Sequence, residues 1–124
     1  MTKTKKINDL AEIIPTGTLA QVVGVHSRTL RIWDKKGLLC PGRSTKNRRN
    51  YTMKDVERAK VIYFMTRNLA LNLCGVKILL AILEKEKVAS SDMMKYVLEL
   101  TKLAKISKQE QEINIKKTEK RHSA

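Results

Sequence analysis

The side chains of this sequence that could bind a partner are mainly cationic, and they concentrate between residues 24 and 60. This stretch contains 11 Lys+Arg and 3 Asp+Glu. Its densest cluster holds Arg43, Lys46, Arg48 and Arg49 without an intervening acid. Guanidinium and ammonium groups bind phosphate oxygens. Since the chain has a formal net charge of +14 over 124 residues, we expect its partner to be a polyanion: DNA, RNA or an acidic membrane surface.

The remaining reactive residue types do not form a pattern typical of an enzyme. The sequence has no paired catalytic carboxylates, no nucleophile with a base nearby and no glycine-rich phosphate loop. We therefore expect no catalytic residues, no cofactor and no metal. The two cysteines, Cys40 and Cys74, cannot form a disulfide framework and are too few for a thiolate metal site. We expect both to be structural.

Length and composition exclude further classes of protein. A chain of 124 residues forms one domain with at most an appended helix, and its 42% hydrophobic content supplies a small core. An aromatic content of 4% argues against a stacking platform for single-stranded nucleic acid. The longest apolar run, residues 78–83, is too short to span a membrane. We therefore predict a cytoplasmic protein without a membrane partner.

Two short helices that could position cations are predicted before residue 38. Pro15 and Thr16 set the start of the first, Thr16 as its cap, and Gly24 ends it. Ser27 is the expected cap of the second, which ends near residues 36–37. Ala20 is small where two helices must approach closely, Gly24 suits a turn with positive φ, and Leu30 is an apolar anchor. The pattern predicts a helix-turn-helix.

The second of these helices has one basic face. Projected at about 100° per residue, Arg28, Arg31, Lys35 and Lys36 fall on one arc, whereas Leu30 lies on the opposite side. This arrangement suits a recognition helix, although an ordinary amphipathic surface helix has the same pattern. Trp33 lies on the flank, where we expect core packing, with an edge contact to a DNA backbone as the alternative.

Residues 38–51 are predicted to form a small β-hairpin, or wing, beside that helix. Short apolar ends flank a polar tip, and Asn47 suits its turn. The wing would carry Arg43, Lys46, Asn47, Arg48 and Arg49 to phosphates flanking the recognition helix. The alternative is a disordered basic loop.

Three more helices follow. Thr52 is the expected cap of one, with Asp55 at its third position, and residues 75–87 form the next, with an apolar face of Val76, Leu79, Leu80 and Leu83. The last carries Met93, Val97, Leu100 and Ala104 at 4-3-4 spacing, the seam of a coiled coil. We expect this seam to mediate homodimerisation, the alternative being packing onto the chain's own domain.

The predicted fold is therefore mainly α. It has a winged helix-turn-helix domain with a small β-hairpin wing, and a C-terminal coiled-coil dimerisation helix. The predicted domains are a basic flexible arm at 1–13, the DNA-binding domain at 14–88, the dimerisation helix at 89–112 and a polar tail at 113–124.

The combined pattern resembles the MerR superfamily of winged-helix regulators. It consists of TGTLA at 16–20, GV at 24–25, TLRIWDKKGLL at 29–39, Pro41, Arg43, Arg49, Tyr51 and DV at 55–56. His26 directly after the turn and NLCGVK at 72–77 resemble the HspR branch of heat-shock repressors. One departure is the sequence Ile32-Trp33-Asp34, where MerR proteins usually have Tyr-Tyr-Glu, so a phosphate hydrogen bond is lost at Ile32.

This resemblance implies a dimer that pairs its long helices in an antiparallel coiled coil and binds an inverted repeat of double-stranded DNA upstream of chaperone operons. A chaperone or co-chaperone would act as co-regulator, and RNA polymerase would be affected indirectly. The protein would then be associated with the bacterial nucleoid. The DNA contacts map to His26, Ser27, Arg28, Thr29, Arg31 and Trp33 on the recognition helix, and to Arg43, Arg48, Arg49 and Tyr51 on the wing. We expect Tyr51 to serve partly as the packing foot of the wing.

Two other functions stay open at this point. An excision-type or architectural DNA-binding protein would also need a winged fold and a high positive charge. A MerR-type redox- or metal-responsive activator would depend on Cys40 and Cys74.

Overall fold

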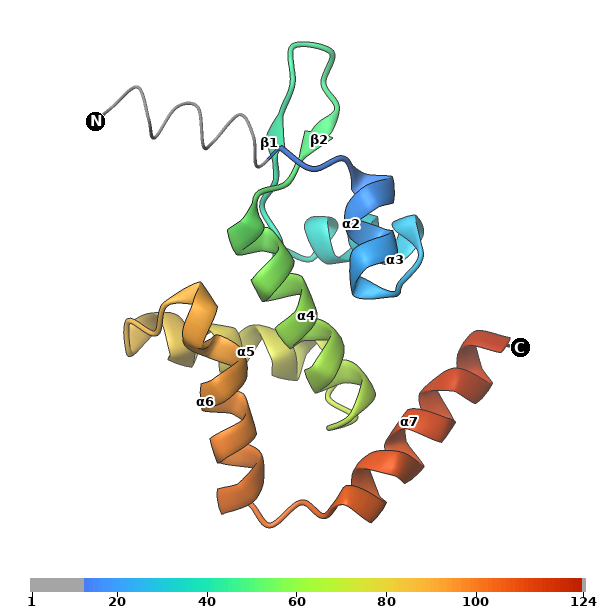
Figure 1. Cartoon of the computed structure of the whole chain (residues 1–124), viewed down its shortest axis with the longest axis vertical. Coiled ribbons are helices and arrows are strands. Elements are labelled where there is room, and N and C mark those ends of the chain that lie inside the picture. The colour runs from blue at the N-terminus through green and yellow to red at the C-terminus, as the bar shows by residue number, and fades with distance from the viewer. Residues whose placement is uncertain (1–12, 124) are drawn as a thin grey trace. The chain divides into compact units, whose positions relative to one another are not determined.

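The computed structural model describes residues 13–123 and is mainly helical (Figure 1). Its elements are α2 (Thr16–Val23), α3 (Ser27–Lys35), β1 (Gly42–Arg43), β2 (Arg49–Asn50), α4 (Met53–Arg67), α5 (Leu73–Lys85), α6 (Ser90–Leu103) and α7 (Lys108–Ser123). The chain divides into two compact units after Ala59, inside α4. The predicted basic arm lies outside the described residues apart from Ile13, and the other predicted domain boundaries stay predictions.

The helix-turn-helix in the first unit is formed by α2 and α3. Gly24 ends α2 with φ 91°, as the turn was expected to require. The Ala20 carbonyl accepts hydrogen bonds from Gly24 N at 2.8 Å and from Val25 N at 2.9 Å. These two bonds satisfy the end of α2 and direct the chain into α3.

The predicted caps of both helices are displaced by one residue. Pro15 and His26 occupy the N-cap positions, without side-chain capping bonds, and Thr16 and Ser27 are the first helical residues. The reason is that the Pro15 carbonyl already accepts from Leu19 N at 3.0 Å, and the His26 carbonyl from Leu30 N at 3.4 Å. Thr16 and Ser27 therefore do not cap these helices.

The predicted wing is present as a short antiparallel hairpin. Gly42 pairs with Asn50, and Arg43 pairs with Arg49. Asn47 adopts φ 60°, which confirms its place in the turn. Ser44 Oγ also holds the tip, because it accepts from Lys46 N at 3.2 Å and from Arg48 N at 3.1 Å. The hairpin projects beyond α2 and α3 in Figure 1.

The core of the first unit is built from apolar residues of the helices and from the segments flanking the wing. Tyr51, directly after β2, is fully buried, and it forms an isolated antiparallel bridge with Ile14. Arg58 Nε donates to the Leu38 carbonyl at 2.6 Å, which ties α4 to the segment before the wing. The buried residues are Leu19, Ala20, Val23, Leu30, Trp33, Leu38, Leu39, Tyr51, Val56 and Ala59.

The start of α4 confirms Thr52 as its cap and shows in addition that Asp55 bonds back to it. Thr52 N donates to Asp55 Oδ2 at 2.9 Å, and Asp55 N donates to Thr52 Oγ1 at 3.4 Å. The two residues thus satisfy each other's backbone groups, as in a capping box.

In the second unit, the start of α5 differs from the prediction. α5 begins at Leu73 rather than at residue 75, because Asn72 caps it by accepting from Gly75 N at 2.8 Å. α6 begins at Ser90, with Ala89 at the N-cap position, so Ser90, Ser91 and Asp92 belong to its first turn. Val76, Leu80 and Leu83 are buried as expected, and Leu79 is half-buried.

The single C-terminal helix expected over residues 89–112 is divided into two. α6 ends at Leu103, Lys105 adopts φ 58°, and α7 covers the stretch predicted as a polar tail. Figure 1 shows α6 and α7 diverging from their short connection. α7 is held partly by amides: Asn68 Nδ2 donates to Gln111 Oε1 at 3.1 Å, and Asn114 Nδ2 donates to the Asn68 carbonyl at 2.8 Å.

The apolar stripe of α6, which was expected to mediate homodimerisation, is mostly buried within a single chain. Met93 and Val97 are 3% and 0% exposed within one chain, with Thr101 at 5%. Leu100 is half-buried and Ala104 is exposed. The stripe therefore fills the second unit's own core, which was the alternative considered from sequence. Dimerisation stays a prediction that must rest on other surface.

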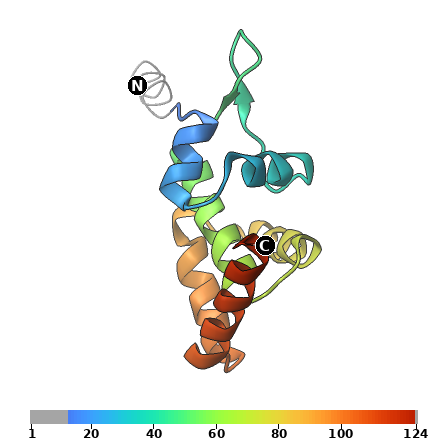
Figure 2. The same cartoon turned by 90° about the vertical axis from the view of Figure 1, so that its right-hand side faces the viewer.

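Figure 2, turned by 90° from Figure 1, gives a second view of the helices that make up this fold. Within the part of the chain that the structure describes, none of them is both long and apolar enough to cross a membrane.

Candidate nucleic-acid interface

The basic face of α3 is presented to solvent and its apolar side is buried. Arg28, Arg31, Lys35 and Lys36 are exposed, the last as the C-cap residue. Leu30 is completely buried and Trp33 is 3% exposed. The sequence-predicted division of this helix into a cationic face and a core face is therefore present in the structure.

The residues at the start of α3 are accessible to different degrees. His26 is exposed, whereas Ser27 and Thr29 are half-buried. All three lie in the turn or the first turn of the helix, where backbone N–H groups and short polar side chains can reach phosphate oxygens. Their predicted role in DNA binding stays a prediction.

The wing presents some of its predicted contacts and buries others. Arg43, Lys46, Asn47 and Arg48 are exposed. Arg49 is half-buried and Tyr51 is completely buried. Together with the four cations of α3, the exposed wing cations form what we call the basic surface: Arg28, Arg31, Lys35, Lys36, Arg43, Lys46 and Arg48.

An ion pair that the sequence analysis missed joins the wing to α3. Asp34 Oδ2 accepts from Arg49 Nε at 2.7 Å and from Arg43 Nη2 at 3.4 Å. The available signal was the isolation of Asp34 among cations, since no other acid lies between residues 24 and 54. Spacing could not identify its partners, because they lie 9 and 15 residues further along the chain.

Tyr51 is a core residue with an unusual phenol. Burial raises its pKa above the ordinary value of 10.0, and the Thr16 hydroxyl and the Arg49 guanidinium offset only part of this rise. The Thr16 hydroxyl lowers the pKa of the phenol, but among the described residues the Tyr51 hydroxyl has no partner at hydrogen-bonding geometry. Of the two roles expected for Tyr51, the structure supports the packing foot.

Two neighbouring apolar residues on α3 differ sharply in exposure. Ile32 is 40% exposed, whereas Trp33 is buried in the core. The indole therefore has almost no surface for a phosphate, which favours core packing over the DNA contact implied by the resemblance. Ile32 places an apolar side chain on a face that is otherwise cationic.

The two cysteines do not behave as packing residues. Cys40 and Cys74 are both exposed with free thiols. The expectation that they are structural is therefore wrong, because a thiol at the surface contributes little to a core. Among the described residues, no three His, Cys, Asp or Glu side chains gather where they could hold a metal ion.

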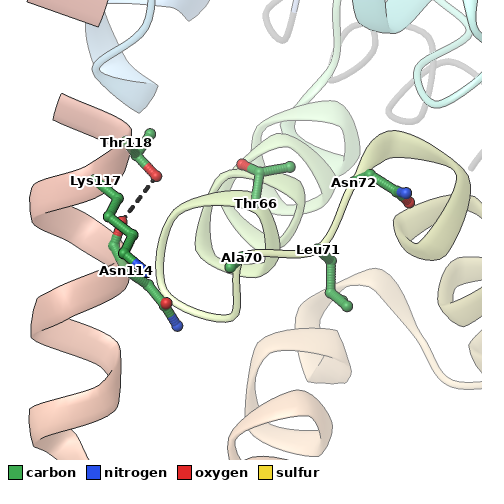
Figure 3. Close-up of a pocket in the computed structure, with 7 residues that line it drawn as sticks. All are labelled: Thr66, Ala70, Leu71, Asn72, Asn114, Lys117 and Thr118. Carbon is green, nitrogen blue, oxygen red and sulfur yellow. Dashed lines mark hydrogen bonds between the residues drawn. The ribbon is translucent and has the colours of Figure 1, made fainter. Parts of the chain in front are cut away.

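The second unit contains a cavity of about 260 Å³ beside the middle of α7. Figure 3 shows that its lining comes from α7 and from the end of α4 and the connection to α5. The lining residues are Thr66, Ala70, Leu71, Asn72, Asn114, Lys117 and Thr118. None of these residues was predicted from sequence to bind DNA.

Comparison with known proteins identifies a family that matches the described part of the first unit and the beginning of the second unit. Residues 14–82 match the family described as MerR HTH family regulatory protein. A protein of Streptomyces coelicolor, provisionally described as heat shock protein HspR, is 34% identical over 58 residues. This match covers 47% of the present chain and 38% of the relative, so it spans less than half of either protein.

The family match covers the helix-turn-helix, the wing, α4 and most of α5, and the exposed cations of α3 and the wing lie inside it. The chain belongs to the MerR HTH family of regulatory proteins.

Proposed function

We propose that this regulator represses chaperone or heat-shock operons by binding an inverted repeat of double-stranded DNA as a homodimer. The observation that carries the DNA-binding part is the basic surface. Four of its cations lie on α3, whose opposite side is anchored by Leu30 and Trp33, and three lie on the wing. Such an arrangement supports base contacts from the helix and phosphate contacts from the wing.

The heat-shock assignment is supported by a narrower observation. The Streptomyces coelicolor relative carries an HspR description, and its match to this chain is 34% identical. His26 and the residues 72–77 supply the sequence features that resemble that branch. The regulated genes would then encode chaperones, with a chaperone or co-chaperone as co-regulator and RNA polymerase affected through promoter occupancy.

Selection of bound sequences from a random duplex pool is the most direct test. The expected product is an inverted repeat, because a two-fold symmetric dimer selects two identical half-sites. Footprinting on chaperone promoters should then protect the same repeat. Enrichment of single half-sites would remove the dimer from the proposal, and unprotected chaperone promoters would remove the heat-shock role.

Sequence specificity distinguishes an architectural or excision-type DNA-binding protein from the proposed repressor. Such a protein would bind selected and random duplex with similar affinity, whereas a repressor is expected to prefer its operator by about a thousandfold or more. Titration of both duplexes at one salt concentration measures this ratio.

A redox-responsive activator is favoured only by the exposure of Cys40 and Cys74. Replacing both with Ser should abolish an oxidant response if thiols sense it. Full regulation by the double variant would leave the repressor proposal as the better account.

The C-terminal helix is the proposed site of chaperone regulation. Ending the chain before Lys108 removes α7 as a whole, including its contacts from Gln111 and Asn114 to Asn68. Repression and chaperone binding should both change in this truncated protein. Unchanged behaviour in both assays would exclude α7 from the mechanism.

A further inference from the structure

Asp34 is an acid within a surface that should attract a polyanion. Between residues 24 and 54 the sequence holds nine Lys+Arg and this one carboxylate. A carboxylate close to phosphates weakens DNA binding through like-charge repulsion. Its presence on α3 therefore needs a reason other than affinity.

The contacts of Asp34 supply that reason. Its bond from Arg49 Nε is 2.7 Å long, and the two side chains are 19% and 20% exposed, so water screens this charge-assisted bond only partly. The contact from Arg43 is longer, at 3.4 Å, and the Arg43 side chain is 43% exposed. Asp34 thus has one firm partner and one loose partner, both on the wing.

The wing needs such an attachment because its own ladder is short. The ladder of the hairpin has two residue pairs, Gly42 with Asn50 and Arg43 with Arg49, and one further backbone bond from Ser44 N to the Arg48 carbonyl at 2.8 Å. A two-stranded hairpin is marginally stable alone and cannot set its own angle to a helix. The Asp34–Arg49 pair links the last turn of α3 to β2, which fixes the wing against the recognition helix.

We propose that Asp34 is a positioning residue that holds the wing at the angle at which α3 and the wing engage one DNA site together. This inference rests on the proposed sequence-specific DNA binding. Arg49 is the anchor of the wing and does not contact DNA. In the complex, Arg43 leaves Asp34 and binds a phosphate, because its contact with Asp34 is longer than that of Arg49 and its side chain is more exposed.

The decisive measurement is the ratio of affinities for two duplexes, the one that the wild-type protein selects from a random pool and a random one. In Asp34→Asn this ratio should fall about tenfold, because the wing loses its fixed angle, while affinity for random duplex rises with the lost negative charge. A residue important only for folding would lower both affinities together.

Glu57→Gln is the matched control. Glu57 is a half-buried acid of α4 in the same unit, and its side chain makes no hydrogen bond or ion pair with any described residue. The Glu57→Gln substitution removes one negative charge, as Asp34→Asn does, but leaves the wing unchanged. The ratio of affinities of this variant should therefore stay at the wild-type value. Asp34→Glu keeps a carboxylate and should retain most of the ratio.

The two arginines should give different results. Arg49→Gln should lower the specificity ratio as Asp34→Asn does, and the double variant should be no worse than either single one, because both remove the same link. Arg43→Gln should instead weaken binding to both duplexes and reduce the salt slope by about 1.

A wild-type ratio in folded Asp34→Asn, or equal losses in Asp34→Asn and Glu57→Gln, would overturn the inference. Thermal unfolding establishes that each variant is folded, and if Asp34→Asn is not, Arg49→Gln and Asp34→Glu decide. A wild-type protein without a preference for its selected duplex would overturn the proposed function first, which is a different result from the same titration.

Discussion

The phenol of Tyr51 shows how a residue can be placed by the core although its family pattern suggests a surface role. It is completely buried, and its hydroxyl has no hydrogen-bond partner within residues 13–123. An unpaired buried hydroxyl costs free energy, whereas the ring contributes packing. Its value to the protein is therefore the ring.

Removing the Tyr51 hydroxyl should not destabilise the protein. We expect Tyr51→Phe to change the free energy of unfolding by less than about 1 kcal/mol, toward greater stability, because an unsatisfied polar atom is lost. Urea denaturation measures this change. A loss of more than about 1 kcal/mol would indicate that the hydroxyl has a partner in solution.

The same variant tests the raised pKa of Tyr51. A phenol whose folded-state pKa lies above its unfolded value contributes stability below the unfolded value, near pH 10.0, and this contribution is lost as pH rises through the folded pKa. The stability of the wild-type protein should therefore fall relative to Tyr51→Phe above pH 10.0. Parallel pH profiles of the two proteins would contradict the shift.

At the scale of the element, short capping interactions decide where the helices begin. Thr52 and Asp55 satisfy each other at the start of α4, and Asn72 does so for Gly75 at the start of α5. By contrast, α2, α3 and α6 begin without a side-chain cap. The hydrogen-bonding capacity of Thr16 and Ser27 predicted their proximity to a helix start but not its exact residue.

Loss of the Thr52 cap should therefore destabilise the protein measurably. Thr52→Ala removes the acceptor of Asp55 N and should cost about 1 kcal/mol of unfolding free energy. Thr45→Ala is a suitable control, since Thr45 is exposed at the tip of the wing and should change stability by less than about 0.5 kcal/mol. Equal effects in urea denaturation would show that the capping bonds are not important for stability.

At the scale of the whole molecule, the burial of α6 changes what can hold two copies together. Met93 and Val97 belong to the core of a single chain, so they are not available to a partner. Leu103 is 78% exposed and Tyr96 is 36% exposed on the same helix. Substitutions at the buried positions should act on folding and not on association.

Met93→Ala distinguishes these two effects. We expect a loss of about 2–5 kcal/mol in unfolding free energy, the usual cost of truncating a buried methionine. Sedimentation of the folded protein should show the association constant of the proposed dimer unchanged. Weakened association without a loss of stability would return Met93 to the dimer interface.

The basic surface predicts a steep salt dependence of DNA binding. Each phosphate contact contributes about −0.9 to the slope of the logarithm of affinity against the logarithm of salt concentration, so seven cations would give at most about −6 per protomer. Titrations of duplex DNA at several salt concentrations measure the slope. A slope near zero would show that the basic surface does not bind phosphates.

The sequence by itself determined the class of the protein and most of the DNA-binding unit. The turn at Gly24, the anchor Leu30, the basic arc of α3 and the turn at Asn47 follow from local rules that involve few residues. Together with a net charge of +14, these features indicate a winged DNA-binding protein before any distance is known.

Tertiary structure alone decided which predicted contacts face solvent and which fill the core. Trp33 and Tyr51 are buried, and Arg49 binds Asp34 across 15 residues of sequence. The tertiary structure also divides the predicted C-terminal helix into α6 and α7, and it buries Met93 and Val97 in the core of a single chain. The physical reason is that periodicity shows that a face is apolar, whereas the surface that covers it depends on contacts between segments far apart in the chain.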